Sequence, residues 1–331
     1  MSKNTYNSWR NQINWKNTNQ HNKLLIEDYV LELKARNRAV GTISQYENDL
    51  KLFATYLYDH CKNIPFHKVS KKQIRNFIIV MQNKEMSPAR INRILSSIRT
   101  MYDYAMDDED YEDDYITNPA AKIKGLKKEK VRAIEFLTME QIEFLHKYLM
   151  DDEKYQQALL LAILIDSAAR KNEVYQIKKS AIKMDDNFTN EVKGKGGKTF
   201  ELMYHDLTKE TYKYYLRQRG EDDFEYLWYT IDCLGGMHEL PQRQIYEWVK
   251  SWNRILKKEY NKEFDINVHS FRHSALDLFN TGEHYMCKKL GIEKLELSEL
   301  QLMANHNDIS TTNSYLQDRS KDILKEKFKL K

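Results

Sequence analysis

The chain has 331 residues, enough for two domains with a core each, and its 10 glycines and 4 prolines favour a mainly helical protein. Its 53 basic residues nearly balance its 49 acidic ones, so the net charge of +4 says little about partners. Three separated cysteines without a CxxC pair, a polar beginning and no run of 18 apolar residues argue against disulfides, secretion and membrane spans. We therefore expect a cytoplasmic protein without membrane contacts.

The beginning of the chain predicts an arm followed by two helices. Residues 1–20 are rich in Asn, Lys and Gln without apolar periodicity, so we expect a flexible arm. Apolar residues at helical spacing begin at Leu24 and pause near residues 37–41. A second amphipathic helix follows, and the hydroxyl of Thr42 is placed to cap its first amides.

Two more helices complete the first domain. One is expected over residues 71–82, and another begins after Ser87, a good N-cap, with Pro88 in its first turn. The last helix carries apolar residues three and four positions apart up to Ala105. We therefore predict a domain of four helices over residues 21–120.

Two charged segments separate this domain from the next one. Residues 107–114, with the sequence DDEDYEDD, are predicted to form a solvated acidic loop. Residues 121–134 are predicted to form a basic extended linker, which can lie along a DNA backbone and displace its counterions, or remain a plain solvated linker. Its cations are Lys122, Lys124, Lys127, Lys128, Lys130 and Arg132.

The second domain is expected over residues 135–331. Thr138 caps its first helix, and residues 155–168 are apolar on all sides, which predicts a buried central helix. Residues 188–204 change to strand-like alternation, with Phe200, Leu202 and Tyr204 on one face and GKGG as the turn of a hairpin. Helices are expected from there to the end.

Six polar residues of this domain combine into the chemistry of phosphodiester cleavage. They are Arg170, Lys195, His269, Arg272, His306 and Tyr315. Arginine binds phosphate oxygens through a fixed fork of donors and stays charged, so two arginines can neutralise the transition state without a metal ion. A tyrosine hydroxyl can attack phosphorus once arginines and a histidine activate it, and a lysine can protonate the leaving oxygen.

The order and spacing of these residues closely resemble the tyrosine recombinases, the phage integrase family. The segments GTISQYENDLKLFATYL and SPARINRILSSIRTMYDYA look like that family's core-binding domain, and FLTMEQIEFL like the entry to its catalytic domain. In this resemblance, Arg170 and Glu173 match the first arginine motif of the family, and Lys195 matches its hairpin lysine. His269 and Arg272 match the HxxR motif. His306 matches the histidine that follows, and Tyr315 matches the nucleophile.

The resemblance implies a mainly α fold, with an N-terminal four-helix SAM-like core-binding domain and a larger α-helical catalytic domain with a small β-sheet. It implies a site-specific recombinase or integrase of a phage or mobile element that cleaves and rejoins DNA through a 3′-phosphotyrosyl link. Such a reaction needs no ATP, metal or other cofactor. The implied partners are double-stranded DNA and further copies of the chain, with a tetramer as the recombining form.

Three residues depart from the family pattern. A glycine usual two positions before the first arginine is Ala168, a glycine usual before the second histidine is Asn305, and an arginine usual after the hairpin lysine is Phe200. If the turn at Ala168 needs a positive φ, alanine adds strain there, whereas asparagine tolerates that geometry better. These departures leave weakened or lost activity open, and with it a recombinase fold kept as a sequence-specific DNA-binding regulator. A second alternative is a type IB topoisomerase, which has the same chemistry but little site specificity.

Two further features remain to be placed. His269 and His273 are four residues apart, a spacing also found in metal sites, but no third ligand accompanies them and we expect no metal; His273 is expected to pack or hydrogen-bond locally. Beyond Tyr315, Leu316, Ile323, Leu324 and Phe328 have near-helical spacing. This predicts a terminal helix that docks either on its own domain or on a neighbouring protomer.

Overall fold

The computed structural model describes residues 15–127, 134–319 and 327–328. The chain divides into two compact units, an N-terminal unit of residues 1–132 and a C-terminal unit of residues 133–331. Each unit has a hydrophobic core of its own. Among the described residues, no helix has the length and apolar character needed to cross a membrane.

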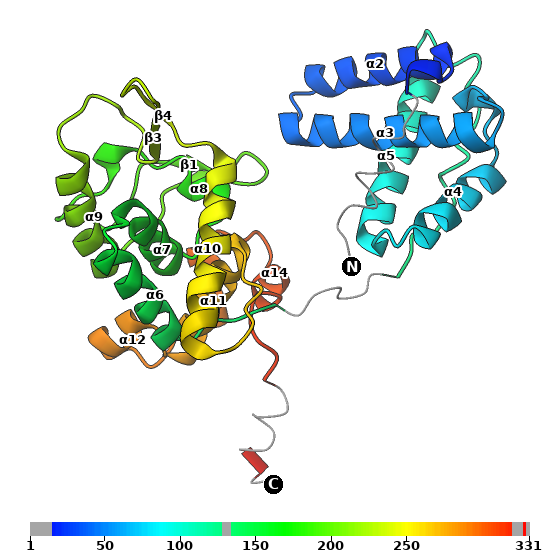
Figure 1. Ribbon diagram of the computed structural model, residues 1–331. Helices are drawn as coiled ribbons and strands as arrows, with labels where there is room; N and C mark the ends of the chain where they lie inside the picture. The colour runs from blue at the N-terminus through cyan, green and yellow to red at the C-terminus, as the bar shows by residue number, and fades with distance from the viewer. Residues whose placement is uncertain (1–14, 128–133, 320–326, 329–331) are drawn as a thin grey trace. The chain divides into compact units, whose positions relative to one another are not determined.

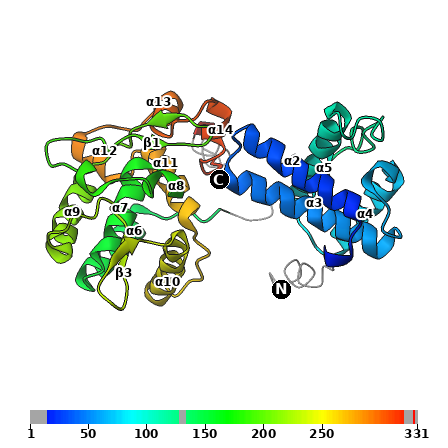
Figure 2. The same ribbon diagram turned by 90° about the horizontal axis from the view of Figure 1, so that it is seen from above.

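The N-terminal unit is a helical bundle in which α2 lies along α3 and both contact α5 (Figure 1 and Figure 2). Its elements in chain order are η1 (Trp15–Asn17), α2 (Gln20–Ala35), α3 (Val40–His60), η2 (Phe66–Lys68), α4 (Lys71–Asn83) and α5 (Pro88–Asp107). The apolar stripes of these helices meet in the core, where Phe53, Phe66 and Phe77 are almost completely buried. The four helices expected in this part of the chain are therefore present.

The first residues of the helices confirm some of the predicted helix starts and contradict others. Ser87 accepts a hydrogen bond from the Arg90 amide at the start of α5, as expected for its N-cap. Thr42, by contrast, lies inside the first turn of α3, because the helix already begins at Val40 after Ala39. The arm predicted over residues 1–20 does not extend to residue 20, because residues 15–20 contain η1, the N-cap Asn19 and the first residue of α2.

The acidic segment folds back on the bundle. Its carboxylates are exposed as expected except for that of Asp108, which is half-buried. Tyr111 is buried, and its hydroxyl donates to the carboxylate of Asp28 on α2. An aromatic residue between acids therefore anchors a turn that the charge pattern alone would leave in solvent.

The basic segment after residue 120 is extended but not free of the bundle. Ile123 is 6% exposed, the side chain of Asn92 bonds both the amide (2.7 Å) and the carbonyl (2.8 Å) of Leu126, and Arg99 donates to the carbonyl of Ile123. Lys122, Lys124 and Lys127 are exposed along this segment. The remaining cations of the predicted linker, Lys128, Lys130 and Arg132, lie outside the described residues.

The C-terminal unit is built around α7, which contacts α6, α9 and α11 (Figure 1). Its helices are α6 (Met139–Asp151), α7 (Tyr155–Ser167), α8 (Lys171–Val174), η3 (Lys179–Ala181), α9 (Asp206–Arg219), α10 (Gln242–Tyr260), α11 (Val268–Thr281), α12 (Tyr285–Leu290), α13 (Leu297–Met303) and α14 (Ile309–Asn313). Thr138 caps α6 in a capping box with Gln141. Residues 158–167 are all buried, as an all-round apolar helix requires.

Two short antiparallel hairpins accompany these helices. The first pairs β1 (Val192–Lys193) with β2 (Thr199–Phe200), and Gly196 and Gly197 supply its turn with φ of 86° and 84°. Leu202 and Tyr204 are buried just beyond it, as their expected shared face requires.

The second hairpin was not expected, because only helices were predicted after residue 204. It pairs β3 (Tyr229–Ile231) with β4 (Met237–Glu239). The carboxylate of Asp232 accepts the amides of Leu234 and Gly236 at 2.8 Å each and so closes the turn. The strands are too short for their alternation to stand out in the sequence.

Asp277 on α11 anchors the chain that follows α14. The carboxylate accepts two hydrogen bonds from the guanidinium of Arg319, at 2.9 and 2.6 Å, and one from the amide of Gln317. Leu316 packs partly buried on the core. The predicted terminal helix falls largely outside the described residues; of its later apolar positions only Phe328 is described, and it is exposed.

A buried carboxylate joins α3 to α5 in the N-terminal unit. Asp49 is completely buried and lies 2.7 Å from Nη2 of Arg90 and 3.0 Å from Nη2 of Arg93. It also accepts a hydrogen bond from the hydroxyl of Ser97 at 3.1 Å. A buried charge is tolerated only while such partners surround it.

Replacing Asp49 by alanine should lower the free energy of unfolding of this unit by about 3 kcal/mol, at the lower end for buried pairs because both arginines reach the surface. Urea-dependent hydrogen exchange of the α3 and α5 amides measures the change. Asp59→Ala, at an exposed aspartate of the same helix, is the control and should change it by less than about 0.5 kcal/mol. Equal losses in the two variants would contradict the proposed role of Asp49.

Candidate active site

Four separate stretches of the C-terminal unit bring the expected site residues together. Arg170 lies between α7 and α8, Arg272 on α11, His306 between α13 and α14, and Tyr315 in the turn after α14. The connection is tertiary, because α11 packs against both α7 and α13, and α13 against α14. Residues more than 140 positions apart in the chain therefore share one site.

Arg272 lies at the centre of this group. It is 1% exposed, and its guanidinium donates from Nη1 to the carbonyl of Ala168 (2.6 Å) and from Nη2 to that of Ala304 (2.8 Å). Nη2 also lies 2.7 Å from Nε2 of His306, while Nε has no partner among the described residues. Burial, and then the charge of Arg170, lower the pKa of Arg272 to about 10, so the group remains charged at neutral pH.

Both ring nitrogens of His306 are engaged. A guanidinium can only donate, so Nε2 accepts from Arg272 and the proton resides on Nδ1, which lies 2.9 Å from the hydroxyl oxygen of Thr312. Burial and then the charges of Arg272 and Arg170 lower the pKa of His306 to about 4. The ring is therefore neutral at neutral pH and held in one orientation.

Tyr315 is surrounded by rings and by a cation. It is 8% exposed, and its ring stacks on that of His273 with centroids 4.4 Å apart. The centroids of His306 and His269 lie 5.0 and 5.1 Å away, and the guanidinium carbon of Arg272 lies 5.0 Å from the ring centre. Its backbone is also held, because Nδ1 of His273 lies 2.9 Å from the carbonyl oxygen of Tyr315.

His269 lies at the exposed start of α11. Desolvation by the groups packed around the ring, then the neighbouring His273 and the charges of Arg272 and Arg170, lower its pKa to about 4. It is therefore a neutral imidazole at neutral pH, the form that can accept a proton.

Glu173 connects the two arginines. It is 1% exposed and accepts the backbone amide of Arg170 at 2.7 Å and its Nη1 at 2.8 Å. The same carboxylate lies 3.8 Å from Nη1 of Arg272. The side chain of Arg170 is 25% exposed, so it is the more accessible of the two cations to an incoming phosphate.

The hairpin that carries Lys195 is attached beside this pair. Gln176 bonds the backbone amide and carbonyl of Lys193 at 2.9 and 3.0 Å. A Cβ added to Gly194 would lie 3.5 Å from Oε1 of Glu173. Lys195 is the next residue after Gly194 and lies in the exposed turn of the hairpin.

The three departures from the family pattern each have a visible structural setting. Ala168 has φ of 50° and ends α7 in the left-handed conformation, and Asn305 has φ of 48°. Alanine is strained in this region, by about 1–2 kcal/mol, yet the carbonyl of Ala168 is the acceptor for Arg272. Phe200 fills the space beside Gly194, where a Cβ would come within 2.6 Å of its ring.

Three residues of the site were missed by sequence reasoning. His273 was expected to act locally and does pack edge-on against His269, but it also stacks on Tyr315, 42 positions away, and lies beside its carbonyl. Thr312 holds the tautomer of His306, and Asp277 holds the chain after Tyr315. A helical projection of α11 would have grouped His269, His273 and Asp277, because they follow one another at intervals of four residues.

The predicted DNA-contacting cations lie in the other unit. Lys122 and Lys124 line a hollow of about 460 Å³ together with Arg75, Ile78, Ile79 and Ile123. Three cations around one hollow form a local positive surface that the small net charge of the chain conceals.

Lowering the pH should destabilise the C-terminal unit through His306. The folded pKa is about 4 and the unfolded one about 6.5, so between these values the unfolded chain binds more protons and the free energy of unfolding falls as pH falls. Between pH 7.5 and pH 5, this residue should account for about 2 kcal/mol of the loss. Urea unfolding at the two pH values measures it.

In His306→Gln, this part of the pH-dependent loss should disappear, whereas His60→Gln, at an exposed histidine of α3, should behave like the unmodified chain. A pH-dependent loss of the same size in all three proteins would mean that His306 is not held neutral by the fold.

Comparisons with known proteins identify the family of the chain. Residues 135–322 match the phage integrase family and residues 26–109 match the phage integrase N-terminal SAM-like domain. Tyrosine recombinase XerC of Staphylococcus saprophyticus is 23% identical over 305 residues, covering 90% of this chain and 93% of the relative. XerD of Oceanobacillus iheyensis is 24% identical over 295 residues, covering 88% and 92%.

Solved structures share the fold. A lambda integrase dimer bound to a COC′ core site superposes with a TM-score of 0.65 at 16% identity over 90% of this chain and 77% of that one. The Tn1549 transposon integrase in complex with transposon right end DNA does so with a TM-score of 0.65 at 15% identity, covering 92% and 99%. The expected mainly helical, integrase-like fold is thus confirmed, and the chain belongs to the phage integrase family of tyrosine recombinases.

Proposed function

We propose that the protein is a site-specific DNA recombinase, that it is catalytically active, and that Tyr315 is its nucleophile. The observation that carries the proposal is the setting of this tyrosine: its ring lies 5.0 Å from the charged guanidinium of Arg272 and against the rings of His306 and His269. A phenol is a weak nucleophile until neighbouring groups activate it. Membership of the family supports the same chemistry.

In the proposed step, the hydroxyl oxygen of Tyr315 attacks the phosphorus of a DNA phosphodiester. Neutral His269 takes the phenolic proton, the bond between phosphorus and the 5′-oxygen breaks, and Lys195 protonates that oxygen. The product is a 3′-phosphotyrosyl link and a free 5′-hydroxyl. The reverse attack by a 5′-hydroxyl restores the phosphodiester and the tyrosine, so no external energy source is consumed.

The two arginines would neutralise the phosphate during this attack. Arg170 is accessible for bidentate binding, and the buried Arg272 is held in place before the substrate arrives. One well-placed arginine in phosphoryl transfer is worth on the order of 10³–10⁵ in rate. A hydrogen bond from His306 to the phosphate would require its bond to Arg272 to open and a proton to reach Nε2, because this nitrogen accepts a hydrogen bond in the free protein.

We further propose that the protein acts on double-stranded DNA as an oligomer. The lambda integrase structures include a dimer bound to a COC′ core site and a tetramer bound to a Holliday junction. The exposed Lys122, Lys124 and Lys127 are candidates for backbone contacts, each displacing counterions. The sequence relatives bear the names XerC and XerD, so a phage or mobile-element origin is no part of this proposal.

Replacing Tyr315 by phenylalanine should abolish covalent capture of DNA while keeping the ring stack. The unmodified chain, incubated with a nicked duplex of its target site, should yield a protein–DNA adduct that survives denaturant. Denaturing gel electrophoresis detects the adduct, and a gel-shift assay checks that both proteins bind the duplex equally. Specific binding without any adduct by the unmodified chain would favour the DNA-binding regulator instead.

Lys195 can be tested as the acid with a substrate that needs no acid. Lys195→Ala should slow cleavage of ordinary DNA at least about 100-fold, but much less for a duplex with sulfur in place of the scissile 5′-oxygen, because a thiolate leaves without protonation. Lys198→Ala, two residues after the turn's first glycine, is the matched control and should slow neither substrate by more than a few-fold. Equal slowing of both substrates by Lys195→Ala would assign this lysine to binding only.

A further inference from the structure

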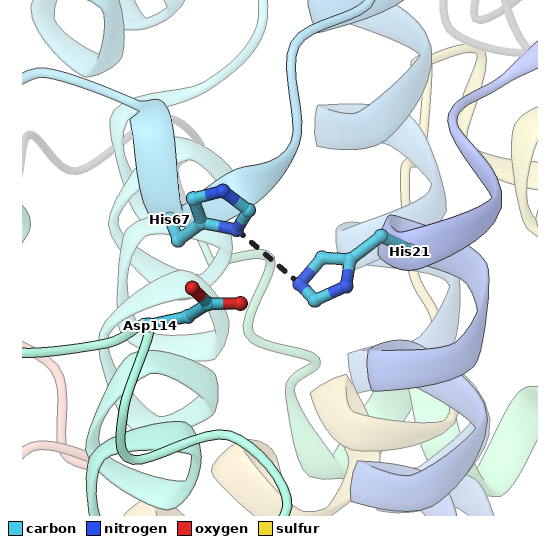
Figure 3. A group of neighbouring side chains, drawn as sticks. All are labelled: His21, His67 and Asp114. Atoms are coloured by element: carbon cyan, nitrogen blue, oxygen red, sulfur yellow. Dashed lines mark hydrogen bonds between the residues drawn. The ribbon is translucent and has the colours of Figure 1, made fainter.

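Three potential metal ligands meet in the N-terminal unit, which contains none of the residues of the proposed reaction. His21 belongs to the first turn of α2, His67 to η2, and Asp114 to the end of the acidic segment after α5. One ligand atom from each lies within 4.8 Å of the other two, and Figure 3 shows both rings and the carboxylate turned toward one another. The histidines are half-buried and the aspartate is exposed.

The spacing of the two imidazoles suits a tetrahedral ion. Nε2 of His21 and Nδ1 of His67 lie 3.4 Å apart. Two ligands at the usual Zn–N distance of about 2.0–2.1 Å and at the tetrahedral angle are themselves about 3.4 Å apart. A hydrogen bond between the two rings would give the same distance. The carboxylate of Asp114 beside them is therefore the feature that favours an ion.

We propose that His21, His67 and Asp114 form a binding site for a divalent transition metal ion of the Zn²⁺ type, with water as the fourth ligand. Two imidazoles and a carboxylate are ligands that this class of ion accepts. The expectation that the chain binds no metal rested on His269 and His273 and did not consider residues so far apart in sequence.

A tyrosine lies beside these ligands. The ring of Tyr115 stacks on that of His21, with ring centroids 6.0 Å apart, and its hydroxyl lies 3.2 Å from Nε2 of His21. An ion bound to Nε2 would take the place of this contact.

An ion at this place would connect three segments that only tertiary packing now holds together. Residues 21, 67 and 114 are separated by 46 and 47 positions. Because the unfolded chain does not present these ligands together, binding would stabilise the folded unit. With the free ion at 100 times its dissociation constant, the folding equilibrium should shift by about 100-fold.

The test uses the full chain after treatment with a chelator and removal of the chelator. Zn²⁺ is titrated in competition with a chromophoric chelator, and thermal unfolding of the N-terminal unit is followed with and without the ion. The unmodified chain should bind one equivalent at this site and its midpoint of unfolding should rise. Asp114→Asn and His67→Gln should each weaken binding at least about 10-fold and remove most of the rise.

Matched controls separate this site from other surface groups. Asp110→Asn changes an exposed carboxylate of the same acidic segment, and His60→Gln an exposed histidine of the same unit. Asp232→Asn disrupts the exposed contact between Asp232 and His238, which is a competing place for Zn²⁺. All three should keep the binding and the stabilisation.

Circular dichroism of Asp114→Asn checks that the exposed substitution leaves the fold intact, so this variant is decisive even if His67→Gln is unstable. The proposal is overturned if the unmodified chain shows no Zn²⁺-dependent stabilisation, or if Asp114→Asn binds the ion as well as Asp110→Asn does. In either case, the two histidines share a proton and hold no metal.

Discussion

The candidate active site depends on the hydrogen bonds of one buried guanidinium. Arg272 connects the carbonyl that ends α7, the carbonyl that follows α13 and the imidazole before α14. A buried charge is stable only with several partners in good geometry, so the positions of these three segments are coupled to one another. The carboxylate of Glu173, 3.8 Å from Nη1 of Arg272, adds a compensating negative charge. The same carboxylate accepts a hydrogen bond from Arg170 and so holds this second arginine in place.

The neutral histidines are a consequence of the same constraint. Desolvation by the packed groups, and then the charges of the nearby arginines, lower the pKa of His306 and that of His269 to about 4 each. Neutral imidazoles can accept protons, whereas protonated ones would add to an already positive cluster. The charges that would attract a DNA phosphate therefore add to desolvation in keeping the histidines around Tyr315 neutral.

Alanine at the end of α7 shows how such a site tolerates an unfavourable residue. Ala168 adopts a left-handed conformation that favours glycine, and it does so completely buried, with its carbonyl bound to Arg272. The strain of about 1–2 kcal/mol is of the same order as one hydrogen bond to a charged group, about 1.5–3 kcal/mol. The departure from the family pattern thus changes the local energy without removing the acceptor.

Much of the fold followed from local patterns. Ser87, Thr138 and the all-round apolar residues 158–167 were interpretable because caps and helical periodicity act within a few residues. Thr42 was misplaced because the helix could begin earlier without a side-chain cap, and the hairpin at β3 and β4 was missed because its strands have only three residues each.

The sequence by itself determined the residue types of the candidate site and their order along the chain. Only the tertiary structure decided that His273 stacks on Tyr315, that Thr312 orients His306, and that His21, His67 and Asp114 converge. The reason is physical: helical periodicity and capping are local, whereas these contacts join helices and turns that meet only when the apolar faces of each unit pack into its core.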